Sequence, residues 1–104
     1  MKIKNTTEKF NFYEENGNYT IDFGTFKKGQ SSIDLLITGI EDSSLLDVVP
    51  TCQCSVSEKK IIDKNTQKVN ISYNECSTKV SKVMEIRYKN QKIGIIKITG
   101  QCTA

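Results

Sequence analysis

Histidine is absent from this chain of 104 residues, and tryptophan is absent too. Ser-His-Asp and Cys-His nucleophilic sites need an imidazole, as do the zinc sites that contain histidine, so the composition excludes those classes. Gly24, Gly29 and Gly39 lack the spacing and the following helix of a phosphate-binding loop. We therefore expect a protein that is not an enzyme, with no catalytic, cofactor-binding or metal-binding residues.

Long apolar runs are missing as well. The longest uncharged apolar stretches, 35–37 and 93–96, have the length of strands, whereas a membrane helix needs roughly 20 residues. The net charge of +3 is small for a nucleic-acid-binding domain. The few aromatic residues fall at inward strand positions, which favours a core over exposed stacking platforms. We expect neither a membrane nor a nucleic acid as partner.

The first residues carry no secretory signal pattern, because Glu8 and Lys9 stand where the apolar segment would begin. This pattern predicts maturation in the cytosol, unless a signal peptide has been removed and replaced by Met1. Basic charge is concentrated in the second half of the chain. Residues 1–52 carry five lysines and eight acidic side chains, whereas residues 53–104 carry ten basic and four acidic ones. This split predicts either a basic end that meets an acidic partner surface or solvated lysines that resist edge-to-edge aggregation.

Apolar residues alternate with polar ones in several short segments, and no segment longer than ten residues keeps a helical stripe. Turn residues separate these segments, at 15–18, 63–66 and 89–91. Pro50 ends a strand that begins near Leu45, because proline donates no ladder hydrogen bond. A change of apolar parity along 92–101 predicts a bulge near Ile95 or burial on both faces.

The pattern predicts an all-β, immunoglobulin-like sandwich of two antiparallel sheets with about seven strands. Residues 19–104 form the domain, and residues 1–18 are a docking arm or a first strand. Nine side chains on the apolar parity of their strands should form the core: Ile33, Leu35, Ile37, Val69, Ile71, Tyr73, Met84, Ile86 and Ile98.

Three landmarks point to a family. They are the segment Asp22 to Gly29, the unit Cys52-Gln53-Cys54, and the closing Ile98-Thr99-Gly100. With these landmarks the region from Tyr19 to Cys102 resembles a bacterial domain-of-unknown-function family within the Hydin/ASPM-type group of immunoglobulin-like modules. The family's usual Asn-Thr-Gly appears here as Ile37-Thr38-Gly39, and its Pro-Gly turn is replaced by Lys64-Asn65. The resemblance implies an immunoglobulin-like fold in which the Cys-x-Cys unit is a structural mark without an established catalytic role.

The four cysteines are the one reactive group of residues. Structural zinc sites favour Cys-x2-Cys spacing, which Cys52 and Cys54 lack, and neither Cys76 nor Cys102 has a near companion. Disulfides are possible in three pairings, but thiols stay reduced in the cytosol. We therefore expect free, metal-free thiols that act as small buried hydrophobes.

Three hypotheses of function remain. The first is a non-catalytic structural or interaction module that docks through residues 1–18 on a large protein assembly, as a phage virion accessory or decoration protein on capsid or tail proteins. It would reside in the virion or the host cytoplasm, and its oligomeric state is open. The second is a bacterial cell-envelope immunoglobulin-like domain in the periplasm, which linked cysteines would favour. The third is a redox protein built on Cys52 and Cys54, which would need a lowered thiol pKa and solvent access.

Overall fold

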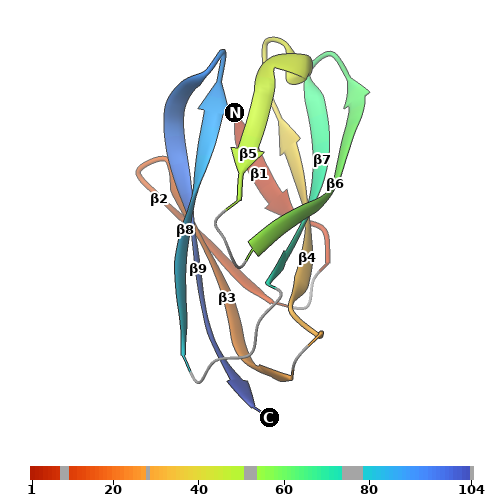
Figure 1. Ribbon diagram of the computed structural model, residues 1–104. Helices are drawn as coiled ribbons and strands as arrows, with labels where there is room; N and C mark the ends of the chain where they lie inside the picture. The colour runs from red at the N-terminus through yellow and green to blue at the C-terminus, as the bar shows by residue number, and fades with distance from the viewer. Residues whose placement is uncertain (8–9, 28, 51–53, 74–78, 104) are drawn as a thin grey trace.

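The chain folds into two β-sheets packed face to face (Figure 1). The computed structural model describes residues 1–7, 10–27, 29–50, 54–73 and 79–103, without the side chains of 54–58. The molecule measures 42 × 23 × 23 Å along its principal axes. The predicted β-sandwich is confirmed, with two sheets that are mostly antiparallel.

The first sheet has four strands in the order β1-β4-β7-β6. All its neighbours are antiparallel. The strands are β1 (Lys2–Asn5), β4 (Ser32–Thr38), β7 (Thr66–Tyr73) and β6 (Cys54–Asp63).

The second sheet has five strands in the order β2-β3-β9-β8-β5. Its neighbouring strands are antiparallel, except for the parallel pair of β3 with β9. The strands are β2 (Asn11–Glu15), β3 (Asn18–Lys27), β9 (Gln91–Thr103), β8 (Val80–Tyr88) and β5 (Leu46–Val49), and a short 3-10 helix, η1 (Ser43–Leu45), precedes β5.

The described residues thus form nine strands, where the sequence predicted about seven. The sequence pattern predicted a first strand around Phe10 and Phe12, which is β2, so the two additional strands are β1 and β6. β1 is short and carries one half-buried apolar residue, Ile3. A strand with so little apolar alternation gives a weak sequence signal. The bulge between β8 and β9 falls between the pairs Ile86–Gly94 and Arg87–Lys92, so Ile93 is the extra residue and the predicted bulge near Ile95 was placed two residues too late.

The turns follow from local chemistry. Asn16 and Gly17 have positive φ angles of 51° and 79°, as the tight β2–β3 hairpin requires. Lys89 and Asn90 do the same between β8 and β9. β5 ends at Val49, immediately before Pro50, as predicted.

The core lies between the sheets. All nine residues predicted for it are buried: three lie on β4, three on β7, two on β8 and one on β9. An aromatic cluster closes one end of the core, where Phe23 and Phe26 on β3 meet at 5.9 Å and Phe26 meets Tyr73 on β7 at 6.3 Å between ring centroids. The single buried amide is Gln67 among the described side chains, and its Nε2 donates to the carbonyls of Ser43 and Leu46.

Candidate functional site

The segment predicted to dock, Met1 to Asn18, forms one lateral side of the sandwich. Its two strands are edge strands: β1 borders the four-stranded sheet and β2 borders the five-stranded sheet. β1 pairs with β4 and β2 pairs with β3, both without a shift of register. We call this the N-terminal side. It places two regular strand edges on one side, and among the described residues neither edge has a second strand partner. Such edges are templates for pairing with another chain.

Hydrogen bonds of polar side chains stabilise the connection between β1 and β2. Asn5 donates from Nδ2 to the Phe10 carbonyl at 3.0 Å, and its Oδ1 accepts from the Thr7 backbone N–H at 2.9 Å. Thr7 Oγ1 in turn accepts from the Asp34 N–H on β4 at 2.7 Å. These bonds fix both edge strands to the domain, which favours a preformed surface on this side.

Three apolar side chains on the N-terminal side are only partly covered. Ile3, Phe10 and Phe12 pack against the core but remain half-buried. Phe12 stacks on Tyr19 with ring centroids 5.8 Å apart, and Phe10 meets Phe23 edge to face at 4.8 Å. Burial raises the pKa of the Tyr19 hydroxyl, and the Glu14 carboxylate beside it raises the pKa further. The core therefore extends to this side without being closed there.

The opposite lateral side, formed by β5 and β6, is protected. The pairing of β6 with β7 is irregular at two places, between Val56 and Glu58 and between Ile61 and Asp63. Lys59 on β6 forms an ion pair with Asp47 on β5, which ties the two edges together. Bulges that distort an edge strand are a device that prevents strand addition. The two lateral sides therefore differ, and the N-terminal side is the one open to pairing.

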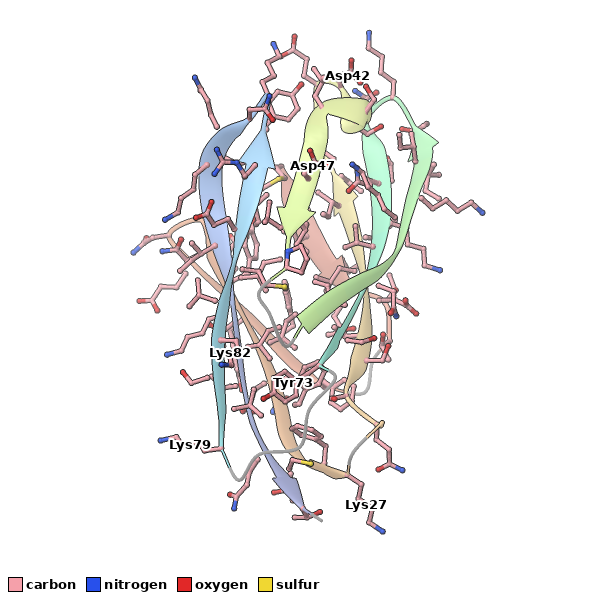
Figure 2. All side chains as sticks on the ribbon, in the orientation of Figure 1. Lys27, Asp42, Asp47, Tyr73, Lys79 and Lys82 are labelled. Atoms are coloured by element: carbon pink, nitrogen blue, oxygen red, sulfur yellow. The ribbon has the colours of Figure 1, made fainter. Side chains whose placement is uncertain are left out.

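The two halves of the sequence do not form two ends of the molecule. Each sheet contains strands from both halves: β1 and β4 lie beside β7 and β6 in one sheet, and β2, β3 and β5 accompany β8 and β9 in the other. Lys27 from the acidic half and Lys79 from the basic half lie at the same end (Figure 2). The predicted basic end is thus not built by the second half as a unit.

Charge is instead sorted between the two edges of the N-terminal side. β1 carries Lys2 and Lys4, whereas β2 carries Glu14 and Glu15. Ile3 packs against the core, so strand alternation places Lys2 and Lys4 on the outer face. By the same alternation from Phe12, Tyr13 and Glu15 lie on the outer face of β2. Tyr13 is 54% exposed.

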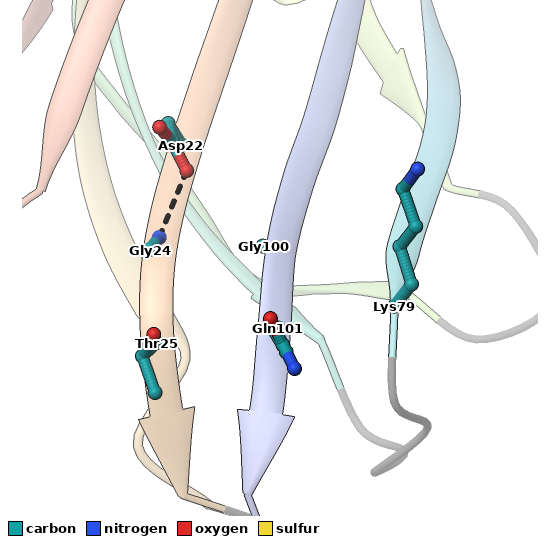
Figure 3. A pocket seen from close by; sticks show the side chains of 6 residues that line it. All are labelled: Asp22, Gly24, Thr25, Lys79, Gly100 and Gln101. Carbon is teal, nitrogen blue, oxygen red and sulfur yellow. Dashed lines mark hydrogen bonds between the residues drawn. The ribbon is translucent and has the colours of Figure 1, made fainter.

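A polar groove of about 600 Å³ lies on the five-stranded sheet, where the register of the parallel pair shifts between Asp22 and Thr25. It is lined by Asp22, Gly24, Thr25, Lys79, Gly100 and Gln101 (Figure 3). Asp22 Oδ1 accepts a hydrogen bond from the Gly24 N–H at 2.9 Å, so its carboxylate serves the local turn. The sequence reasoning missed this groove, because the shift of register that opens it depends on the β3–β9 pairing.

A second, apolar groove of about 160 Å³ lies at the other end of the sandwich, where Ile40, Leu46, Tyr88 and Ile93 meet Met1. Within the described residues there is no group of three or more His, Cys, Asp or Glu side chains that could hold a metal ion. The described residues also contain no helix that is long and apolar enough to cross a membrane.

The cysteines give one correction. Cys102 is disulfide-bonded, so the expected free thiol at this position is wrong. The side chains of Cys52, Cys54 and Cys76 lie outside the described residues. The sequence argument excluded disulfides because the first residues lack a secretory signal pattern. That argument carries no information about which cysteine side chains the fold brings together.

Comparison with known proteins adds no relative: no protein family, curated protein or solved structure matches the chain.

Proposed function

We propose that this protein is a non-catalytic structural or interaction module that docks on a larger protein assembly through its N-terminal side. The observation that carries the proposal is the open pair of regular edge strands, β1 and β2, with Ile3, Phe10 and Phe12 half-buried between them. Partly exposed apolar side chains beside strand edges without a further partner are typical of surfaces that a partner covers. The protected β5–β6 side supports the same choice of face.

A phage virion is the first setting we propose, with the protein as an accessory or decoration protein on capsid or tail proteins. Sandwich modules of this size offer sheet edges and faces as their working surface, and this step is an analogy at the level of the fold. A decoration protein needs only a stable body and one docking side. The stable core and the two unlike lateral sides fit that need.

A bacterial envelope domain is the second setting, and the disulfide at Cys102 is the observation that favours it. Disulfides form and persist in oxidising environments, which include the periplasm and the surfaces of virions and cells, and are rare in the cytosol. The disulfide therefore supports both the envelope and the virion surface over residence in the host cytoplasm. A redox protein built on Cys52 and Cys54 gains no support from the described residues.

The test of the setting is protein mass spectrometry of purified particles and of envelope fractions from the source. We expect stoichiometric recovery in one of the two. Recovery only as a free protein in the soluble fraction would contradict the docking proposal.

The test of the docking side uses point variants, because deleting residues 1–18 would remove two strands and uncover the core. Tyr13→Ala on β2 should reduce incorporation into the assembly. Ile61→Ala is the matched control, since Ile61 is a similarly exposed apolar residue, 49% against 54%, on the opposite edge. Equal incorporation of both variants at wild-type levels would show that the N-terminal side is not the contact.

A further inference from the structure

The edges β1 and β2 have opposite directions. In Figure 1, β1 and β3 both run downward, and β2 is antiparallel to β3. β1 and β2 therefore run antiparallel to each other on the same lateral side, each with one unpaired edge. Two such edges could pair with each other in an antiparallel ladder if they came from different molecules.

The edges also have opposite charges. Lys2 and Lys4 lie on the outer face of β1, and Glu15 lies on the outer face of β2 beside Tyr13. On the inner faces, the half-buried Ile3 and Phe12 point toward the core of the sandwich. The two edges are thus opposite in charge, and each carries an inward apolar residue. This match indicates that a second copy of this chain pairs with the edges.

We propose that two copies form a twofold dimer in which β1 of each copy adds antiparallel to β2 of the other. The symmetry axis runs parallel to the strands, so the four-stranded sheet of one copy continues into the five-stranded sheet of its partner, twice. Lys2 and Lys4 then face Glu15 of the partner copy, and Ile3 and Phe12 are covered at the joint. The same patch is used on both copies and no edge on this side remains unpaired, as a closed twofold interface requires.

The alternative twofold arrangement has like charges in register. With the axis perpendicular to the sheets, β1 would pair with β1 and β2 with β2. Lys2 and Lys4 would then meet their own copies, and Glu14 and Glu15 would do the same. Like charges directly opposite each other on paired strands are destabilising, so this arrangement is disfavoured. The charge pattern selects the crossed pairing.

This inference rests on the proposed function and names the partner at the N-terminal side: within the assembly, the two edges of each copy are covered by a second copy. Four short strands give an interface at the lower end of the usual size range, so we expect a weak dimer that forms with increasing concentration. Higher salt should weaken it, because the charged pairs are exposed.

Sedimentation equilibrium of the purified full chain over a wide concentration range tests the proposal. Lys4→Glu and Glu15→Lys should each weaken dimerisation by about tenfold or more, since every reversal acts at two symmetric positions. The double variant Lys4→Glu/Glu15→Lys should restore it, because the charges are exchanged. Lys60→Glu is the control, with the same charge change on the opposite edge strand β6, and should leave the dimer unchanged.

Wild-type protein that stays monomeric at every concentration would overturn the dimer, and so would single variants that dimerise as well as the wild type. The two proposals fail separately. A monomer that is nevertheless found in particles or envelope fractions would remove only the dimer. A charge-dependent dimer that is absent from both fractions would remove only the docking function.

Discussion

At the scale of single residues, Gln67 shows how a polar side chain can occupy a core position. It lies on the inward parity of β7 with Val69 and Ile71 and is fully buried. Its Nε2 donates to the carbonyls of Ser43 at 2.9 Å and Leu46 at 3.1 Å, at the turn from η1 into β5. Its Oε1 has no partner among the described residues. The side chain therefore connects the two sheets through its Nε2, while the burial of its Oε1 reduces the stability gained.

Replacing Gln67 by Met should destabilise the protein by about 1–3 kcal/mol, because the carbonyls of two buried residues lose their donor. The removal of the unpaired oxygen offsets part of this loss. Urea unfolding measures the difference, and Gln91→Met at an exposed position is the control. A Gln67→Met variant as stable as the wild type would show that the two hydrogen bonds contribute no net stability.

At the scale of elements, the parallel pairing of β3 with β9 brings the backbone of Gly100 close to β3. A Cβ on Gly100 would lie 3.0 Å from the Gly24 carbonyl oxygen and 3.0 Å from a ring carbon of Phe26. Such distances are shorter than ordinary contacts, and one of the two neighbours is backbone. A side chain at position 100 would therefore crowd β3 at the shift of register beside the polar groove.

We predict that Gly100→Ala costs about 1–3 kcal/mol, the usual effect of overpacking. Thermal unfolding should show the loss, with Ser81→Ala on the neighbouring strand β8 as a nearly neutral control. Unchanged stability would mean that β3 and β9 can separate locally without loss of packing.

The pairing of β4 with β7 is the centre of the four-stranded sheet, and its inward residues are fully buried. Leu35→Ala or Ile71→Ala should lower the free energy of unfolding by about 2–5 kcal/mol, the lost transfer energy plus the cavity. Leu36→Ala is the matched control, because Leu36 points to the outer face and is only partly buried. Losses below about 1 kcal/mol at both core sites would contradict the strand parity.

At the scale of the whole molecule, Cys102 on the last strand is disulfide-bonded. Peptide mapping without reduction should recover a peptide that links Cys102 to Cys52, Cys54 or Cys76. Alkylation of all four cysteines in unreduced native protein would contradict the bond.

Removal of this bond by Cys102→Ser should cost about 2–4 kcal/mol, because the unfolded chain gains conformational freedom. Reducing agent should lower the unfolding temperature of the wild type and have a smaller effect on the variant. The same effect of reducing agent on both proteins would show that Cys102 is not part of the stabilising bond.

Much of the architecture could be predicted from the sequence. Period-two alternation located the core strands, because each strand with one buried face must alternate, and the nine predicted core residues are buried. Turn residues placed the hairpins at Asn16-Gly17 and Lys89-Asn90, because positive φ angles select few residue types. These signals are local, and the sequence alone determines them.

The tertiary structure decided what depends on which strands are neighbours. β1 and β2 became edge strands of different sheets, although their few apolar residues gave little indication of pairing. The parallel β3–β9 pair and the groove beside it join residues far apart in the chain, and Cys102 is disulfide-bonded. For the same reason, the charge difference between the sequence halves does not predict a basic end of the molecule, because each sheet contains strands from both halves. Local patterns fix each strand, but contacts over long sequence separations fix the surface that a partner meets.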